Sequence, residues 1–368
     1  MKKGWEYKKL GEVCKTYAGG TPLKTCKEYY DGGTIPWLRS GEVCRKYIDS
    51  TELFITQKGM DNSSAKYYPV NTIVVAMYGA TAAQVGILKI ESTSNQAVCG
   101  ILPNDRFVPE FLFYWFTYIK DFLASQAQGG AQPNISQVKI KNLTTPVPPL
   151  SEQKEIVEYL DSSFAKIDKL KENAAKNLEE AKALFQSALK DALEPKEGWE
   201  EKTLIKEFSL KSGDNLSAKK QIKGPYDVYG GNGVTGSHIE YNLSGKNILI
   251  GRVGALCGNI HFVNAKIWVT DNAFIVKDIS EHWHMDFLTY ELKYLNLNQY
   301  ASQTAQPVIS NKSMKDVMIM LPPLSEQQSI VSFLDSLNEK VNTLQQNYSR
   351  ICNECDALKQ AILRQVFE

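Results

Sequence analysis

The stretch Pro149-Leu150-Ser151-Glu152-Gln153 recurs as Pro323-Leu324-Ser325-Glu326-Gln327, 174 residues further along the chain. The similarity continues beyond it, because twelve of the 22 positions from 149 to 170 carry the same residue as their counterparts. Self-similarity at a fixed offset is the sequence signature of a duplicated unit. At 368 residues the chain also exceeds the usual size of a single core. The sequence therefore predicts two copies of one structural unit.

Each copy consists of a globular part and a helical part. Gly4-Trp5-Glu6 and Gly198-Trp199-Glu200 stand at the two starts. We expect globular domains at 1–149 and 197–323 and helical spacers at 150–196 and 324–368. Trp5 to Ser151 covers 146 residues and Trp199 to Ser325 covers 126, so the first globular part carries about twenty extra residues.

Both helical segments carry residues at alternating spacings of four and three, a pattern typical of a coiled-coil seam. We predict an antiparallel helix pair, with two unrelated amphipathic helices as the alternative. About forty residues at ~1.5 Å each would give roughly 60 Å, enough to hold two domains apart. The apolar residues assigned to helix pairing are Ile156, Leu160, Ile167, Leu170, Leu184, Ile330, Leu334, Leu337, Val341, Leu344, Ile351, Leu358 and Ile362. Ser325 and Gln328 predict a capping box at the second helix start.

The globular segments are typical of a mixed α/β (α+β) fold. Short β-branched runs at 72–75, 247–250 and 267–270 lie between Gly, Asn and Pro residues and predict strands. Residues 111–122 and 286–297 predict helices that bury aromatic faces on a sheet.

Composition narrows the class of protein. No run of eighteen apolar residues and no apolar stretch behind Met1 occurs, so we expect a cytoplasmic protein that makes no membrane contact. Seven scattered cysteines favour reduced thiols. The net charge of +1 results from opposite charge excesses in different segments of the chain. Residues 1–150 carry 17 basic against 12 acidic residues and residues 151–197 carry 8 against 11, which is weakly compatible with a polyanion at the globular part.

Motifs for catalysis and metal binding are missing. Gly231-x-Gly233-x-x-Gly236 precedes another turn instead of a helix, so it predicts a glycine-rich loop and no phosphate site. The chain has no GxxxxGK[ST] motif, and both Pro-Pro pairs lack the Asn or Asp of amino-methylating DNA enzymes. Cys352 and Cys355 lack a second cysteine pair, and His282 and His284 lack a third ligand. We assign no catalytic and no metal residue.

Further short motifs appear in order in the two halves. The first half has the stretch 35–41 (Ile-Pro-Trp-Leu-Arg-Ser-Gly) and Tyr78-Gly79-Ala80-Thr81, followed by Asn95-Gln96. The second half has the stretches 229–233 (Tyr-Gly-Gly-Asn-Gly), 250–254 (Ile-Gly-Arg-Val-Gly) and 271–273 (Asp-Asn-Ala). Individually weak, these motifs and the twin Pro-Pro-Leu-Ser-Glu-Gln segments make the whole chain similar to the specificity (S) subunit of Type I restriction–modification systems.

This resemblance implies a non-catalytic subunit with two target-recognition domains, each reading one half of a bipartite site in double-stranded DNA. The paired helices would dock two modification subunits, which bind S-adenosylmethionine, and restriction (translocase and nuclease) subunits would join them. This chain itself would bind no cofactor. Because the globular sequences differ more than the helices, the target is expected to be asymmetric.

Residues expected to touch DNA lie in loops rich in Gly, Ser and Lys. Arg and Gln suit bidentate contacts to bases, and Lys suits phosphates. In the first domain the candidates are Lys24, Arg39, Ser40, Lys58, Tyr78, Gln132 and Asn134. In the second domain they are Lys219, Lys220, Tyr229, Asn232, Arg252, Gln306 and Ser310. For each of these the alternative is an ordinary surface or turn residue.

Two other classes of function remain as alternatives. A non-enzymatic coiled-coil scaffold that binds proteins would fit the near-neutral charge and would show no base preference. A methyltransferase or nuclease in its own right would act on DNA without partner subunits.

Overall fold

A computed structural model describes residues 2, 4–126, 134–302 and 306–368. The chain forms two compact units. Unit 1 comprises residues 1–173 and 350–368, and unit 2 comprises residues 174–349. Both ends of the chain therefore belong to unit 1.

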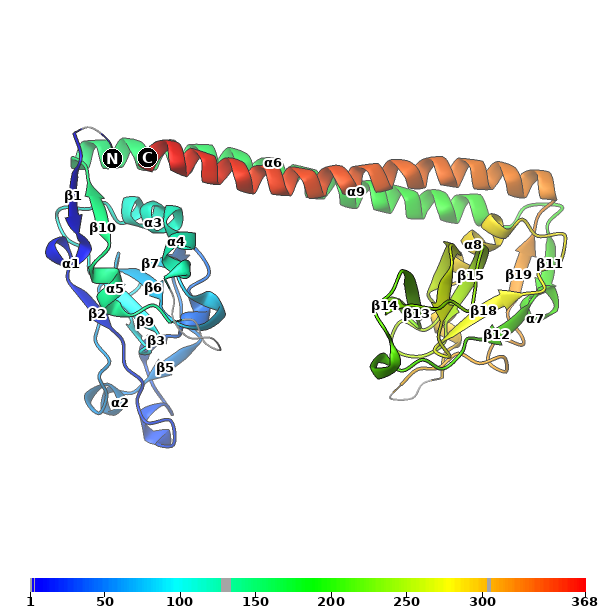
Figure 1. Ribbon diagram of the computed structural model, residues 1–368, viewed down its shortest axis with the longest axis horizontal. Coiled ribbons are helices and arrows are strands. Elements are labelled where there is room, and N and C mark those ends of the chain that lie inside the picture. The colour runs from blue at the N-terminus through cyan, green and yellow to red at the C-terminus, as the bar shows by residue number, and fades with distance from the viewer. Residues whose placement is uncertain (1, 3, 127–133, 303–305) are drawn as a thin grey trace. The chain divides into compact units, whose positions relative to one another are not determined.

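Unit 1 contains three sheets (Figure 1). The main sheet has the strand order β2 (Thr16–Ala18), β9 (Val98–Ile101), β6 (Ile73–Ala76), β7 (Val85–Leu88) and β4 (Tyr47–Ile48). The second sheet has the order β5 (Leu53–Ile55), β3 (Ile35–Leu38) and β8 (Thr93–Ser94). Antiparallel strands β1 (Glu6–Lys9) and β10 (Thr144–Val147) form the third.

The described residues of unit 2 repeat this topology without a counterpart of β4. Its main sheet has the order β12 (Ser209–Ser212), β18 (Ala273–Lys277), β15 (Lys246–Gly251) and β16 (Ile260–Asn264). The second has β14 (Gly233–His238), β13 (Tyr226–Gly230) and β17 (Ile267–Val269), and the third pairs β11 (Glu200–Thr203) with β19 (Met318–Leu321). The duplication and the mixed α/β fold are thus confirmed.

Helices cover one face of each main sheet. The helix expected at 111–122 is split into α3 (Pro109–Tyr118) and α4 (Lys120–Ser125), and the one expected at 286–297 is α8 (Met285–Tyr294) followed by the turn η5 (Leu297–Tyr300). The remaining short helices and turns are α1 (Leu10–Val13), η1 (Lys27–Tyr29), η2 (Ser40–Glu42), α2 (Gln57–Asp61), η3 (Gly79–Thr81), α5 (Gln137–Lys141), α7 (Leu204–Glu207) and η4 (Ala218–Lys220). None of the helices in the described part of the chain combines the length and the apolar run that crossing a bilayer requires.

Both faces of the central strands are buried, which explains their continuous apolar runs. On β6, Ile73 and Val75 join the core that contains α3, whereas Val74 and Ala76 join the core that contains Leu38 of β3. This alternation follows from the two-residue period of a strand. Each main sheet is therefore a middle layer between helix and smaller sheet.

The long helices are α6 (Leu150–Leu193) and α9 (Leu324–Phe367), and they lie side by side (Figure 1). Within unit 1, Lys171 Nζ lies 2.8 Å from Asp356 Oδ1, so the end of α9 runs antiparallel along the start of α6. Within unit 2, Leu189 and Leu193 share a core with Leu334. The predicted antiparallel pair is confirmed.

Four leucines assigned to the seam do not pack in it. Leu170, Leu184, Leu344 and Leu358 are 52%, 66%, 40% and 50% exposed. The other assigned residues are buried or half-buried. Cys355, which lies at the predicted spacing of four after Ile351, is buried as well, and burial shifts to Leu178, Leu189 and Leu363. The reason is that residues spaced at a strict 3.5-residue repeat rotate around a straight helix by ~20° per heptad. Over five heptads this rotation reaches about 100°, so the buried position moves by about one residue along the sequence.

The predicted capping box at Ser325 is also wrong. Helix α9 already begins at Leu324, so Ser325 lies inside the first turn. The amide groups of Glu326 and Gln327 donate instead to the carbonyl of Pro323. Pro323 therefore takes the N-cap position, and its carbonyl accepts the first backbone bonds of the helix.

A buried glutamine ties each long helix to its globular part. Gln153 and Gln327 are both 0% exposed. Gln327 Oε1 accepts from the His284 amide at 2.7 Å, and its Nε2 donates to the carbonyls of His282 (2.8 Å) and Pro322 (2.9 Å). The amide group thereby joins the helix start to the turn before α8. We call this set of bonds the glutamine brace.

Unit 1 contains the same brace at its own helix start. Gln153 Oε1 accepts from the Val108 amide at 2.8 Å, and Nε2 donates to the carbonyls of Arg106 (2.8 Å) and Pro148 (2.9 Å). The repeated glutamine therefore has one structural role in both units.

Two further contacts accompany each brace. Trp5 Nε1 donates to Glu152 at 2.7 Å, and Trp199 Nε1 donates to Glu326 at 3.0 Å. Eight residues further along each long helix, Tyr290 donates to Asp335 at 2.6 Å, as Tyr114 does to Asp161 in unit 1. Burial and the neighbouring carboxylate raise the pKa of Tyr290, so the phenol stays protonated as a donor.

Replacing Gln327 with alanine should destabilise unit 2 by at least about 3 kcal/mol. The change leaves one amide and two carbonyls without their buried partner, at ~1–3 kcal/mol for each unsatisfied group. Calorimetry of the full chain measures the shift. Gln328→Ala, on the next and exposed residue, is the matched control and should change the melting temperature little. Equal melting temperatures for the two variants would show that the brace is dispensable.

Glu291 makes the stability of unit 2 depend on pH. Burial raises the pKa of this carboxyl, which is 3% exposed, from 4.5 to about 7. The folded form therefore loses stability as pH rises from about 4.5 to 7 and does not regain it above. Glu291→Gln should melt higher than the parent at pH 8, with a gain that vanishes near pH 4. The exposed Glu201→Gln is the control, and a gain independent of pH would contradict the assignment.

Candidate nucleic-acid interface

In unit 2, loops from distant parts of the chain meet beside the ends of the strands. The Arg252 amide donates to Asn272 and the Ile309 amide donates to Arg252, each at 2.9 Å. The Thr270 amide donates to Tyr229, the last residue but one of β13, also at 2.9 Å. These bonds join the loops after β13, β15 and β17 to the segment around 309 as one surface.

Unit 1 has the same set of backbone hydrogen bonds between its loops, which we call the backbone frame. The Met77 amide donates to Ala97 at 2.8 Å, and the Ile135 amide donates to Met77 at 2.9 Å. The Asn95 amide donates to Leu38 at 2.9 Å, across the carboxyl ends of the parallel strands β3 and β8. Because backbone groups make the frame, its side chains are free to differ between the units.

The frame shows that the two predicted arginine readers are not equivalent. Arg252 stands at the position that Met77 occupies in unit 1. Arg39 follows Leu38, whose counterpart in unit 2 is Tyr229, so Arg39 corresponds to Gly230. The two units therefore present an arginine from different loops.

The Arg252 side chain is held in place. Its Nη1 donates to Ser212 Oγ at 3.3 Å and to the Asp271 carbonyl at 3.4 Å, and its guanidinium lies 5.2 Å from the centre of the Phe274 ring. Within the described residues, its buried Nε has no hydrogen-bond partner. These contacts hold the guanidinium in one place, which suits recognition of acceptors on a base by its outer N–H groups.

Tyr229 and Asn232 lie on the hairpin between β13 and β14. The ring of Tyr229 contacts His261 edge to face, with 6.0 Å between ring centres. Asn232 is exposed and accepts from Asn259 at 3.3 Å. The glycine motif at 231–236 is thus part of a β-hairpin, with no helix following it.

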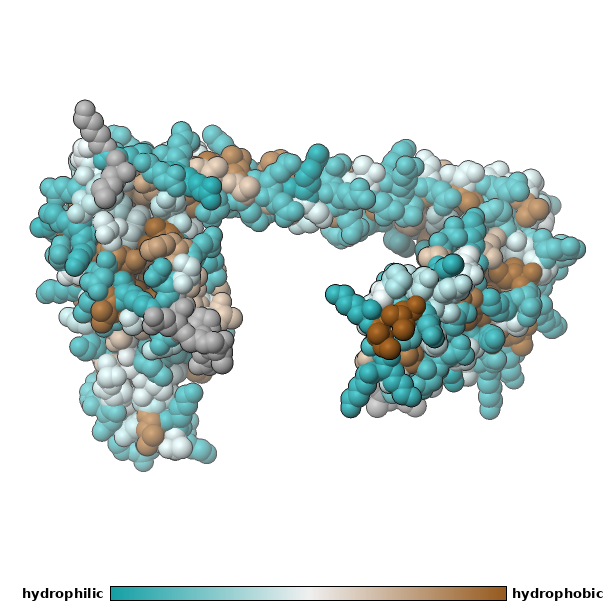
Figure 2. Space-filling model, in the orientation of Figure 1, coloured by the Kyte–Doolittle hydropathy of each residue, from teal (hydrophilic) through white to brown (hydrophobic). Residues whose placement is uncertain are grey.

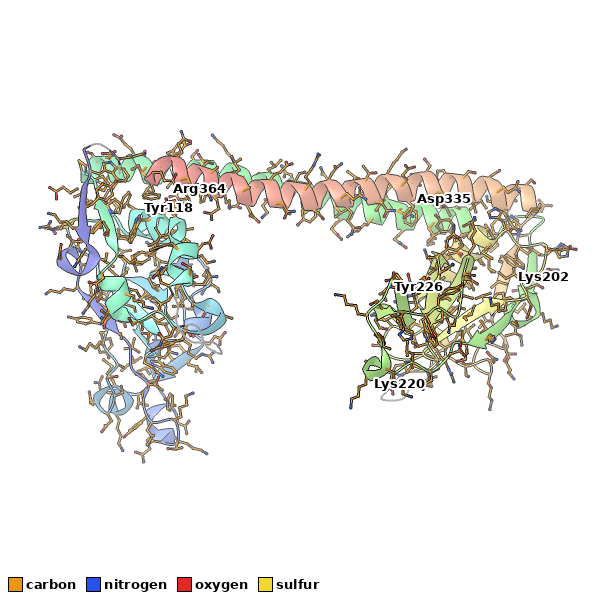
Figure 3. All side chains as sticks on the ribbon, viewed as in Figure 1. Tyr118, Lys202, Lys220, Tyr226, Asp335 and Arg364 are labelled. Carbon is orange, nitrogen blue, oxygen red and sulfur yellow. The ribbon has the colours of Figure 1, made fainter. Side chains whose placement is uncertain are left out.

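The other candidates of unit 2 differ in exposure. Lys219 and Lys220 are exposed on η4, and Figure 3 shows Lys220 at the end of the unit that is remote from Asp335 on α9. Gln306 is exposed as well. Ser310 is half-buried and its hydroxyl accepts from the Ser313 amide at 3.2 Å, a turn-stabilising role.

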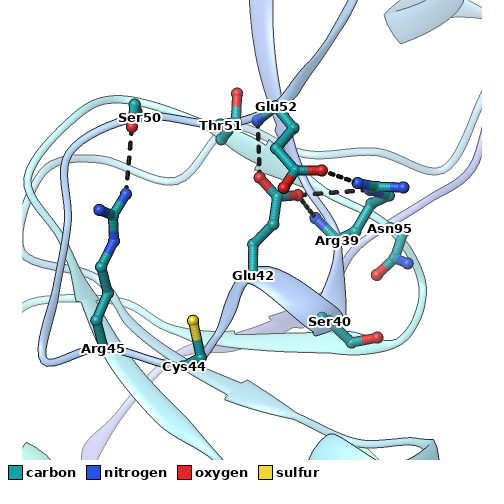
Figure 4. Close-up of a pocket in the computed structure, with 10 residues that line it drawn as sticks. Arg39, Ser40, Glu42, Cys44, Arg45, Ser50, Thr51, Glu52 and Asn95 are labelled. Atoms are coloured by element: carbon teal, nitrogen blue, oxygen red, sulfur yellow. Dashed lines mark hydrogen bonds and ion pairs between the residues drawn. The ribbon is translucent and has the colours of Figure 1, made fainter. Parts of the chain in front are cut away.

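In unit 1, Arg39 lies between two glutamates (Figure 4). Glu42 Oε2 accepts from the Arg39 amide at 2.8 Å, and Glu42 Oε1 accepts from the Glu52 amide at 2.7 Å. Glu52 forms an ion pair with Arg39 Nη2. Glu42 thereby connects the loop after β3 to the residues before β5.

Arg39 also lines two hollows in the surface. The larger, of about 730 Å³, is lined by Ser40, Arg45 and Glu52 among others, and the smaller, of about 310 Å³, by Lys24 and Trp37 among others. Arg39 and Asn95 line both. The structure thus brings the predicted Lys24, Arg39 and Ser40 together.

The remaining candidates of unit 1 lie elsewhere. Lys58 is exposed on α2 and forms an ion pair with Glu28. Tyr78 and Asn134 pair as an isolated bridge, and Asn134 Oδ1 is buried without a hydrogen-bond partner among the described residues. Gln132 lies outside the described residues.

The predicted DNA contacts did not include Asn95, Glu42 or Glu52, although all three line the larger hollow. The Asn95-Gln96 motif was a usable signal for the first. Nothing in the sequence pattern marked the two glutamates, because their link to Arg39 arises only when the loop folds back.

Within the described residues, no group of three or more His, Cys, Asp or Glu side chains is arranged to hold a metal ion. Cys355 is buried and Cys352 is half-buried on α9. The backbones of His282 and His284 serve the glutamine brace.

Comparison with known proteins places the chain in a family. Residues 2–180 and 196–351 match the family described as the Type I restriction modification DNA specificity domain. The chain belongs to this family. It carries two such specificity domains, and the resemblance noted in the sequence is confirmed.

Individual relatives agree with this assignment. The chain is 27% identical over 371 residues to the Type I restriction enzyme EcoprrI specificity subunit of Escherichia coli, covering 95% of this chain and 91% of the relative. A solved chain from a type I R-M system, studied for complex assembly and conformational transition, has the same fold with a TM-score of 0.80 at 21% identity, covering 100% of this chain and 98% of that chain. The HsdS subunit from Thermoanaerobacter tengcongensis has a TM-score of 0.57 at 20% identity, covering 100% and 97%.

In this specificity domain, Glu42 should stabilise the connection between β3 and β5. Glu42→Ala removes two charge-assisted bonds to backbone amides, which we expect to cost roughly 2–3 kcal/mol locally. Hydrogen–deuterium exchange should show faster exchange at Arg39 and Glu52. Glu52→Ala, which removes only an exposed ion pair, should leave both amides protected. Equal protection in the two variants would contradict the role given to Glu42.

Proposed function

We propose that the chain reads a bipartite, asymmetric target in double-stranded DNA, one half with each unit, and catalyses no reaction itself. The observation that carries this proposal is the duplicated backbone frame with different side chains. At one position of the frame unit 2 has Arg252 where unit 1 has Met77, and at another unit 2 has Gly230 where unit 1 has Arg39. Base edges are distinguished by the donors and acceptors presented to them, so such a difference favours two different half-sites.

The partners follow from the family. We assign S-adenosylmethionine to modification subunits, expected as two copies, which dock on α6 and α9, and we expect restriction subunits in the same cytoplasmic assembly. In support, each unit exposes leucines on these helices: Leu170 and Leu358 in unit 1, and Leu184 and Leu344 in unit 2. Figure 2 shows hydrophobic residues interrupting the hydrophilic surface of the helices. These exposed leucines support apolar docking at equivalent places, because Leu170 and Leu344 are 174 residues apart, as are Leu184 and Leu358.

Selection from a random duplex library tests the function. The full-length chain should enrich duplexes with two blocks of defined bases separated by an unselected spacer. A protein-binding scaffold would enrich no sequence, and a chain that methylates DNA without partner subunits would contradict the non-catalytic assignment.

Arg252 and Lys219 should affect binding of the enriched duplex differently. Arg252→Ala should cost roughly 1–3 kcal/mol and relax preference at one position of one half-site. Lys219→Ala should weaken binding to all sequences about equally and lower the salt slope by roughly one, because it removes a phosphate contact. Fluorescence anisotropy at several salt concentrations separates the two. Unchanged base preference in Arg252→Ala would reassign that residue to packing on Phe274.

A further inference from the structure

We propose that Glu52 is a specificity-determining residue, and that Arg39 and Glu52 together read one G·C base pair in the half-site of unit 1. Arg39 would contact guanine, and Glu52 would accept from the N4 amino group of cytosine. The inference rests on the proposed function, because it names a reader within the DNA-contacting surface.

The two glutamates beside Arg39 are not interchangeable. Both carboxylate oxygens of Glu42 are committed to backbone amides, and its side chain is only 13% exposed. The Glu52 side chain is 68% exposed, and among the described residues its carboxylate contacts Arg39 alone. Glu42 therefore positions the loop, and Glu52 is the carboxylate that can face a ligand.

The Arg39 side chain is held beside Glu42 and Glu52, but one of its N–H donors makes no hydrogen bond among the described residues. Its side chain is 43% exposed, and its buried Nε has no hydrogen-bond partner within the described residues, with the nearest Glu42 oxygen at 3.6 Å. Arg39 lines both the hollow of about 730 Å³ and the hollow of about 310 Å³. The ion pair of Arg39 and Glu52 thus has open space beside it (Figure 4).

The chemistry of the pair favours a base pair over a phosphate. A lone arginine binds phosphates of any sequence, but a neighbouring carboxylate repels them and itself needs a donor. In the major groove, guanine offers two acceptors, O6 and N7, and its cytosine offers the N4 donor. An A·T pair shows the N6 amino donor of adenine between two acceptors, adenine N7 and thymine O4. The N–H donors of a guanidinium would therefore face another donor at an A·T pair.

This pair has no counterpart in unit 2. Residues 39–52 connect β3 to β5 in unit 1, whereas only Gly231 and Asn232 connect β13 to β14. The connection of unit 1 therefore accounts for much of its extra length. It supplies a carboxylate reader that the other half of the chain lacks.

The test measures binding of the full-length chain to the library-enriched duplex and to its single-base-pair variants. Glu52→Ala should reduce the preference at one G·C pair, which is about 5- to 150-fold where an arginine contact to guanine is bidentate. It should also bind non-matching duplexes more tightly, because a repulsive carboxylate is removed. Glu52→Gln keeps an acceptor and should retain part of the preference. Arg39→Ala should lose preference at the same base pair.

The control is Glu6→Ala, which removes another exposed glutamate of unit 1, ion-paired with Lys8 on β1. This variant should retain the complete motif. If Glu52→Ala also retained it, or lost preference at a base pair other than that of Arg39→Ala, the inference would be overturned while the DNA-reading function stands. If the unmodified chain enriched no sequence, the proposed function and this inference would fail together.

Discussion

The three hydrogen bonds of a buried glutamine side chain hold each unit together at the start of its long helix. A primary amide is suited to this place, because one end accepts and the other donates twice. A glutamate at Gln327 could accept from the His284 amide but would present acceptors to the carbonyls of His282 and Pro322. Since Gln153 makes the same bonds, the constraint acts twice, and it explains why the helix starts are the most similar part of the repeat.

The braces divide each unit into a constant and a variable region. Near the helices, Trp–Glu and Tyr–Asp contacts are repeated with the same residue types. At the strand ends, only the backbone bonds are repeated. Side chains there can change without loss of the frame, which is what a protein needs if two copies of one fold are to recognise different sequences.

Much of this organisation could be predicted from the sequence, because a repeat and an apolar spacing are local patterns. The duplication, the two long helices and the strand at 72–75 were evident in this way. The exact seam was not, because the drift of a straight helix accumulates and exposes Leu170 and Leu344.

Long-range contacts were beyond the sequence for a different reason. Ser325 looked like a cap until the Pro323 carbonyl proved to be the acceptor. Arg39 looked like a free reader, but Glu42 and Glu52 reach it through a loop whose course no spacing rule predicts. The repeated glutamine was visible as a pattern, while its partners, Val108 and His284, lie more than forty residues away.

In the proposed function, the loops at the strand ends of both units contact DNA. Hydrogen–deuterium exchange of the full-length chain, with and without the duplex that it enriches, tests this most directly. We expect added protection at 38–42 and 94–97 in unit 1 and at 251–254 and 270–272 in unit 2, with α6 and α9 unchanged. Protection confined to the helices, or absent from one unit, would contradict the claim that each unit reads half of the target.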